Sequence, residues 1–231
     1  MCGRDWSSDV CSSDLTILPC GVIKQKSRAS TLKYDTNYID VRYTNRFDKA
    51  ELKRMATLRL GGVVGAIGHV PSSLLDVGYG DGAFLKVAAD IVPNVYGFDI
   101  EPAYPLNDNR IQNVASITSQ HYEVVSFFDS LEHFENIYEI GQVKADYIYI
   151  SVPWSPYQTK ADIQEFMTWK HRRVDEHLWH FNAPALRNFM NELGFEEINH
   201  SNIEDIIRKP EKKAQHRPNI LTACFRQKVR V

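Results

Sequence analysis

Apolar positions change their spacing repeatedly along this chain from Ser72 onward. Short runs of β-branched and aromatic residues, typical of strands, alternate with stretches whose apolar residues recur at helical spacing. The runs predict strands at 73–77, 95–99, 111–114, 122–128 and 147–152, followed by two more at 195–201 and 219–227. The helical spacing predicts helices at 49–67, 83–91 and 184–193. Such alternation is typical of an α/β fold, a mostly parallel sheet with helices on both faces.

Composition agrees with one compact domain and excludes several classes of protein. The 231 residues are 43% hydrophobic and 24% charged, with a formal net charge of −2. A balance so close to neutral gives no electrostatic reason to expect a nucleic acid or an anionic lipid surface as partner. Because no apolar run reaches 18 residues, we expect no membrane-spanning helix.

The first 14 residues fit nothing that follows them. They lack apolar periodicity, repeat Ser-Ser-Asp at 7–9 and 12–14, and resemble the translation of a sequencing adapter. We expect residues 1–14 to be non-native, which leaves Cys20 and Cys224 as the credible cysteines. Two thiols so far apart predict no disulfide framework and favour a reducing compartment, the cytoplasm. Cys20-Gly21 could also be half of a metal knuckle, although an inert cysteine is the simpler interpretation.

A glycine-rich turn follows the first predicted sheet strand and opens a helix. It reads Asp76-x-Gly78-x-Gly80-x-Gly82. Glycines let the backbone turn sharply and approach a ligand closely, and the amides at the start of a helix then face that ligand. Nineteen residues beyond Gly80, the next strand ends at Asp99, where a carboxylate can accept both hydroxyls of a ribose. The spacing therefore predicts a site for a nucleoside cofactor.

Two cofactors fit this turn. Gly78, Gly80 and Ala83 satisfy the dinucleotide fingerprint, which would indicate a nicotinamide-dependent oxidoreductase. Asp76 favours S-adenosylmethionine, because a carboxylate there would repel a pyrophosphate but not a cationic methionine group. A ligand-binding module that kept the fold without catalysis is a third possibility.

Later segments match one family in the same order along the chain. Residues 122–134 end in the acid-x-x-Glu-His pattern of Asp129, Glu132 and His133, and 151–153 read Ser-Val-Pro. Residues 177–181 read His-Leu-Trp-His-Phe. Together with the glycine turn, these segments resemble the class I S-adenosylmethionine-dependent methyltransferases, close to the broad methyltransferase-domain group that includes ubiquinone-biosynthesis enzymes. The resemblance covers roughly residues 33–228.

The resemblance implies a fold and a set of positions. The fold is a Rossmann-like, doubly wound sheet of seven strands, the last antiparallel and inserted between the fifth and the sixth. Asp76 and the loop containing Gly78, Gly80 and Gly82 would hold the methionine part of the cofactor, with Asp99 at the ribose and Ile100 at adenine. Asp129 and Ser130 would line the side that bears the methyl group. The acceptor would be a small molecule, which the sequence does not identify.

The stretch 153–182 is too long for a simple connection, and long connections often form lids. It holds three tryptophans and three histidines beside several cations, a composition suited to a planar or anionic molecule. We expect a lid whose acceptor contacts are Trp154, Trp169, His177 and Trp179. His180 is the candidate base, with His133 beside the methyl-transfer site as a comparable candidate. Buried structural histidines, or a metal site using His177 and His180, are the alternatives.

The segment before the glycine turn, residues 15–70, is expected to cover the cofactor. It contains a tyrosine-rich stretch at 34–43, and in related enzymes a segment here folds over the cofactor. The alternative is that these tyrosines only pack the long helix onto the sheet. The predicted organisation is therefore 1–14 non-native, 15–70 covering the cofactor, and 71–231 the methyltransferase domain with its lid.

Overall fold

The computed structural model describes residues 14–26, 35–41, 47–208 and 218–229. Residues 1–13 of the segment expected to be non-native lie outside the described residues, as do Tyr34 and Tyr43 at the ends of the tyrosine-rich stretch. Among the described residues, no helix has the length and apolar character needed to cross a membrane.

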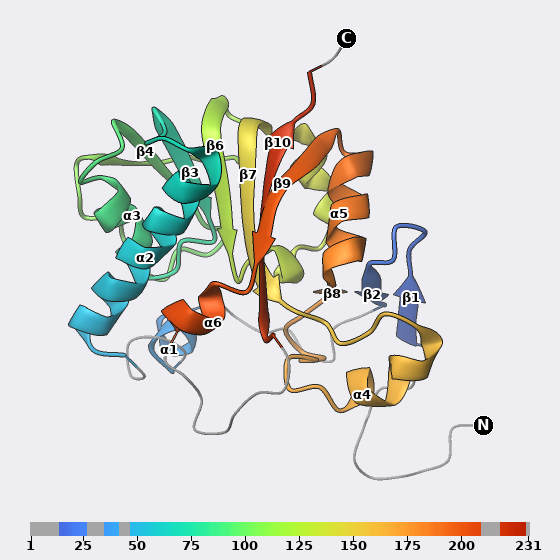
Figure 1. Ribbon diagram of the computed structural model, residues 1–231. Helices are drawn as coiled ribbons and strands as arrows, with labels where there is room; N and C mark the ends of the chain where they lie inside the picture. The colour runs from blue at the N-terminus through green and yellow to red at the C-terminus, as the bar shows by residue number, and fades with distance from the viewer. Residues whose placement is uncertain (1–13, 27–34, 42–46, 209–217, 230–231) are drawn as a thin grey trace.

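A seven-stranded sheet forms the centre of the molecule (Figure 1). Its spatial order is β5 (Ile111–Asn113), β4 (Asn94–Phe98), β3 (Ser73–Val77), β6 (His121–Phe128), β7 (Lys144–Pro153), β10 (Ile220–Gln227) and β9 (Phe195–Ser201). The pairs β5–β4, β4–β3, β3–β6 and β6–β7 are parallel, whereas β10 runs antiparallel to both β7 and β9. The expected topology is confirmed, including the last strand inserted between its two predecessors.

Both faces of the sheet are buried, as alternation along β6 shows. Val125 and Phe127 belong to a core shared with α5 (Ala183–Glu192). Val124 and Phe128 face the opposite way, into a second core with α2 (Lys49–Ile67) and α3 (Ala83–Ala88). Because neighbouring strand residues point to opposite faces, one apolar strand supplies both cores.

Local sequence explains where the two long helices begin and end. Asp48 accepts the amide of Glu51 while the Glu51 side chain accepts the amide of Asp48, which satisfies two free donors at the start of α2. That helix ends at Gly68, in the left-handed conformation at φ 87°. The side chain of Asn182 accepts the Ala185 amide at the start of α5, which has proline in its first turn.

Short elements connect this frame to the site. They are α1 (Thr36–Ile39), the 3-10 helices η3 (Leu131–His133) and η4 (Ile137–Gln142), and α6 (Glu204–Ile207). The predicted helix at 83–91 is shorter in the structure and ends at Ala88. Cys20 and Cys224 are both free and buried.

The stretch 153–182 packs against the N-terminal segment in a second, smaller sheet. Its β8 (Trp179–His180) pairs with β2 (Ile23–Gln25), which in turn pairs with β1 (Leu15–Ile17). Beside this sheet lie η5 (Lys160–Asp162) and α4 (Ile163–Met167), whose Phe166 is fully buried against Ile23 and Tyr157. The sequence pattern missed these strands because two or three residues are too few to show a period.

If 153–182 is packed structure, truncating its central side chain must destabilise the fold. We expect Phe166→Ala to lower the free energy of unfolding by about 3–5 kcal/mol, the cost of a large cavity in a core. Urea denaturation of the full chain measures this. Ile17→Ala in β1, where the side chain is half exposed, is the control and should lower the free energy of unfolding by much less. Equal stability of Phe166→Ala and the parent would restore the mobile-lid interpretation.

Candidate cofactor and acceptor site

The central parallel strands all end at one edge of the sheet, and the site lies there. Register pairs Asp76 of β3 with Gly97 of β4 on one side and with Ser126 of β6 on the other. The loops that follow these strands surround a cavity of about 600 Å³, which α1 and α2 also line. Ligands of open α/β sheets bind at this carboxyl edge, where neighbouring loops diverge.

The glycine turn brings backbone close to the cavity. Gly78, Gly80 and Gly82 have φ of 78°, 57° and 70°, a left-handed backbone conformation that residues with a Cβ rarely adopt. The Gly78 amide donates to the carbonyl of Phe98 at 2.7 Å, which ties the turn to β4. A Cβ at Gly78 would also lie 2.6 Å from the Cβ of Ser130. The turn therefore needs glycine there for conformation and for space.

Asp76 is a buried carboxylate at the base of this turn. Its Oδ1 accepts the hydroxyl of Ser126 at 2.7 Å. Burial raises the pKa of Asp76 to about 7, and the Ser126 hydrogen bond only partly offsets it. Near neutral pH the group is thus poised between its neutral and charged forms.

Asp99 and Ile100 stand at the end of β4, where the family resemblance places the ribose and adenine. The Asp99 carboxylate accepts the amide of Gly80 at 3.2 Å, and burial raises its pKa. Ile100 lines the cavity with 80% of its surface exposed. Residues 115–117, which follow β5, also line the cavity.

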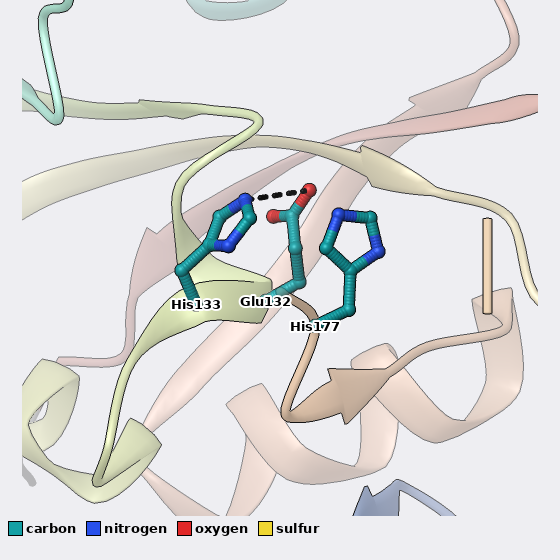
Figure 2. A group of neighbouring side chains, drawn as sticks. All are labelled: Glu132, His133 and His177. Carbon is teal, nitrogen blue, oxygen red and sulfur yellow. Dashed lines mark ion pairs between the residues drawn. The ribbon is translucent and has the colours of Figure 1, made fainter. Parts of the chain in front are cut away.

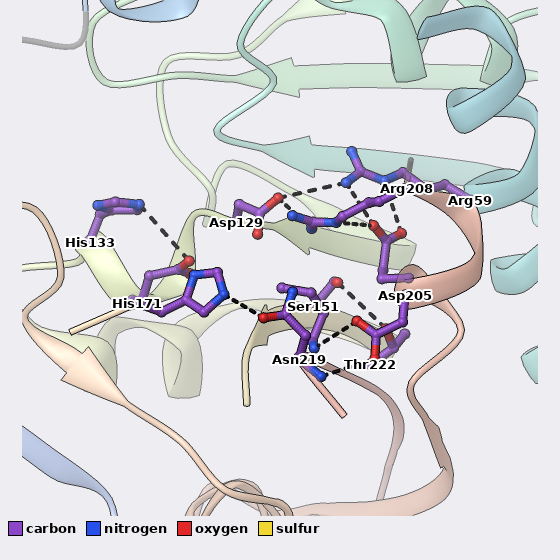
Figure 3. A network of polar contacts seen from close by, with 12 residues as sticks. Arg59, Asp129, His133, Ser151, His171, Asp205, Arg208, Asn219 and Thr222 are labelled. Carbon is purple, nitrogen blue, oxygen red and sulfur yellow. Dashed lines mark hydrogen bonds and ion pairs between the residues drawn. The ribbon is translucent and has the colours of Figure 1, made fainter. Parts of the chain in front are cut away.

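A cluster of charges forms the other end of the cavity (Figure 3). Asp129, the one described non-glycine residue with positive φ (53°), contacts Arg208 at 2.6 Å and Arg59 at 3.6 Å. Both guanidinium groups also bind the Glu204 carboxylate at 2.9 Å. Burial alone would raise the pKa of Glu204, but Arg59 and Arg208 hold it at about 2. Asp129, Ser130 and Arg59 line the cavity.

Sequence reasoning missed Arg59, Glu204 and Arg208. These residues come from α2 and the region of α6, far from Asp129 along the chain, and no motif joins them. Arg59 gave one weak signal, as a charged residue between Leu58 and Leu60 in an apolar helix. A strained backbone at Asp129 is typical of functional sites, since packing around it must offset the strain.

His133 is the predicted catalytic histidine that the structure brings to the cavity. It lies in η3, two residues beyond a fully buried Leu131. Its Nδ1 is 3.0 Å from the carbonyl oxygen of Glu176, so this nitrogen donates and carries the proton of a neutral ring. Tyr38 and Ile39 of α1 line the same cavity, as expected of a segment that covers the cofactor.

The predicted contacts in 153–182 lie elsewhere. No described residue of this stretch lines the cavity. His180 is buried between Phe166 and Trp169, and burial lowers its pKa to about 3. His180 does not line the cavity, and its role as a base stays a prediction.

The other predicted acceptor contacts are structural in this conformation. Trp179 is buried and donates its indole N–H to the carbonyl of Phe134 at 2.6 Å. Trp154 forms a bridge to Phe181, and Trp169 packs beside Phe166. His177 is buried, with Nδ1 2.8 Å from the carbonyl oxygen of His171. These side chains pack against one another and against the smaller sheet, and their contact with an acceptor stays a prediction.

Comparison with known proteins identifies the class. A family model described as "Methyltransferase domain" matches residues 42–200, more than half of the chain. The chain belongs to this family. The comparison with curated protein sequences found no match.

Solved structures share the fold at low sequence identity. One is magnesium protoporphyrin IX methyltransferase from Synechocystis with bound S-adenosylhomocysteine, at TM-score 0.55 and 12% identity over 84% of this chain and 96% of that one. Another is 1,6-didemethyltoxoflavin-N1-methyltransferase from Burkholderia thailandensis, crystallised with 1,6-didemethyltoxoflavin and S-adenosylhomocysteine. It aligns at TM-score 0.54 and 17% identity over 93% and 99%.

Family and fold together define the protein as an S-adenosylmethionine-dependent methyltransferase. The sequence argument for this cofactor over a dinucleotide is confirmed at that level. Neither neighbour identifies the acceptor of this chain.

Cofactor affinity should depend on pH through Asp76. We expect the ionised carboxylate to favour the α-ammonium group in the amino-acid part of the cofactor, so affinity for S-adenosylhomocysteine should fall as the pH drops through about 7. Between pH 8 and pH 6 the loss should be about tenfold, since the ionised fraction changes by that factor. Calorimetric titration at both pH values measures it. Asp76→Asn should bind more weakly at pH 8 and lose most of the dependence; a variant with the full tenfold change would refute this role.

Asp99 should carry much of the cofactor's binding free energy. Two charge-assisted hydrogen bonds to ribose hydroxyls predict that Asp99→Ala weakens S-adenosylhomocysteine binding by about 2–4 kcal/mol. Asp99→Asn should lose part of this while the fold survives, as thermal denaturation would show. Glu196→Ala is the matched control, because this carboxylate pairs with Arg226 at the surface of β9 and lies outside the cavity, so the variant should bind as the parent does. If Asp99→Ala bound S-adenosylhomocysteine as tightly as the parent, Asp99 could not be the residue that binds the ribose.

Proposed function

We propose that this methyltransferase acts on a small-molecule acceptor bound between Asp129, Ser130 and Arg59. The observation that carries the proposal is a single cavity that runs from Asp99 past the glycine turn to this charged end. A volume of about 600 Å³ is within the range of small-molecule sites. The cofactor and one acceptor would share it.

The two ends of the cavity suit two different ligands. The Asp99 end offers a carboxylate and exposed apolar surface for a nucleoside. The Asp129 end offers Arg59 stacked 4.7 Å over the Phe128 ring, a pair that provides a flat apolar surface with charge at its edge. Leu52 and Met55 of α2 complete this end. The arrangement favours an acceptor with a planar apolar part and a polar group.

Asp129 is the group that would orient the acceptor. Two guanidinium groups contact its carboxylate, whose oxygens accept hydrogen bonds. A hydroxyl or amine of the acceptor would donate to it and so face the methyl group. Methyl transfer from a sulfonium is an in-line displacement, in which alignment and exclusion of water supply most of the acceleration.

His133 stands beside this position and replaces His180 as the histidine nearest the reaction. A hydroxyl acceptor must lose its proton as the methyl group is transferred, whereas a neutral amine can accept the methyl group and lose a proton afterwards. The site thus contains an orienting carboxylate and an imidazole on one wall. The two free, buried cysteines agree with the proposal that the protein works in a reducing compartment such as the cytoplasm.

Removing the charge at residue 129 should impair turnover and spare the cofactor. Asparagine tolerates positive φ, so Asp129→Asn keeps the backbone while weakening one charge-assisted hydrogen bond. We expect kcat/KM to fall about 10- to 100-fold for an acceptor found in a panel of phenols, sugars and amines. Release of S-adenosylhomocysteine measures turnover, and calorimetry should show nearly unchanged affinity for that product. A kcat/KM in Asp129→Asn equal to that of the parent would exclude Asp129 as the residue that orients the acceptor.

A further inference from the structure

A buried carboxylate lies just behind the cavity wall, and no donor among the described residues satisfies it. Glu132 is 1% exposed, and both of its carboxylate oxygens are buried without a hydrogen-bond partner. Its backbone is fixed, because its carbonyl accepts the amide of Leu178 at 2.8 Å. A buried anion without compensation is costly, so such a group in a native protein calls for a bound partner or a proton.

Two imidazoles flank this carboxylate (Figure 2). His133 lies on one side, with Nε2 4.0 Å from Glu132 Oε1, and His177 lies on the other. The rings themselves are 4.8 Å apart between centroids, in an edge-to-face arrangement. One donor atom from each of the three residues lies within 4.8 Å of the other two.

The hydrogen bonds on the far side of each ring set which nitrogen is available. His133 Nδ1 donates to the Glu176 carbonyl and His177 Nδ1 donates to the His171 carbonyl, at 3.0 and 2.8 Å. Each neutral ring then keeps its lone pair on Nε2. Metal-binding histidines are oriented in this way, with the second ring nitrogen donating to a backbone carbonyl or carboxylate.

We propose that Glu132, His133 and His177 bind a divalent transition-metal ion at the wall of the cavity. Metal bonds of about 2.1 Å hold donor atoms roughly 3–4 Å apart, so the three side chains need only small rotations to close on an ion. Two imidazole nitrogens and one carboxylate oxygen favour Zn²⁺, Co²⁺, Mn²⁺ or Fe²⁺ over Mg²⁺ and Ca²⁺, which prefer oxygen ligands.

The site would be open toward the acceptor. Three protein ligands leave at least one coordination position, and His133 itself lines the cavity while His177 lies behind it. An acceptor oxygen in that position would have its pKa lowered by the ion, which would favour the reactive anion. This last role depends on the proposed function, whereas binding of the ion does not.

Asp129 is not part of the ligand set. Its carboxylate is bound to Arg208 and Arg59, which keep it in the charged cluster described above. The carboxylate of Glu176 is likewise held by Arg173 at 2.9 Å. The geometry therefore defines three ligands from two segments, η3 and the residues before β8, that meet only in the folded chain.

Cobalt titration tests the proposal directly. The full chain, without a histidine tag and stripped with a chelator, is titrated with Co²⁺ while visible absorption is recorded, and Zn²⁺ is then added in competition. We expect one equivalent to bind with d–d bands typical of nitrogen and oxygen ligands, and Zn²⁺ to displace it while millimolar Mg²⁺ does not. Displacement by Mg²⁺ would overturn the proposed ligand set.

Three variants separate this site from adventitious binding. Glu132→Gln preserves shape and should weaken Co²⁺ binding at least 100-fold, as should His177→Ala. His121→Ala is the matched control, since His121 pairs with Asp146 in an exposed position; it should bind as the parent does. Affinity for S-adenosylhomocysteine and the melting temperature check that each variant is folded.

Two further results would each overturn the proposal: no stoichiometric Co²⁺ or Zn²⁺ binding to the parent, or equal Co²⁺ affinity in the parent and Glu132→Gln. Absence of metal binding would mean that the buried Glu132 carboxyl group is kept neutral by a proton instead. Because metal binding is read without an acceptor, its failure is distinct from failure of the acceptor assignment, which the Asp129 variant tests.

Discussion

Parallel pairing of β4, β3 and β6 is the constraint on which the site depends. Parallel strands in register end together, so the loops after all three must diverge at one edge of the sheet. That edge brings Asp76, Asp99 and Asp129 around one cavity although they are spread over more than fifty residues. The apolar content of the strands is what secures the register, because both faces are buried and a slip of one residue would expose the core.

The carboxylates at this edge have different environments, and their chemistry differs accordingly. Asp76 is buried with one hydroxyl as partner, and its pKa rises to about 7. Asp129 instead lies between Arg59 and Arg208. The first changes its charge near neutral pH, and the second is held by two guanidinium groups. Burial and pairing thus assign two roles to one residue type.

Long-range contacts also join the site to the rest of the fold. Arg59 of α2 binds Glu204, whose segment precedes β10, so the antiparallel strand and the first long helix are linked beside the acceptor end. On the other side, η3 contributes His133 to the cavity and Glu132 to the interior, against the residues that lead into β8. The smaller sheet therefore packs behind the part of the cavity wall that η3 forms.

Sequence alone determined the alternation of strands and helices, the order of the sheet through family resemblance, and the cofactor turn. These features are local or periodic: Gly78 is required by its own backbone conformation, and Asp99 follows at a fixed distance on the next strand. It also placed Asp129, Ser130 and His133 after the fourth sheet strand. Tertiary structure decided the rest. Whether His180 or Trp179 faces a ligand or a core depends on what packs against it, and β2 is too short to show a pattern. The pairing of Arg59 with Glu204 and the proximity of Glu132 to His177 join residues whose separation along the chain carries no signal, because only the folded chain brings them together.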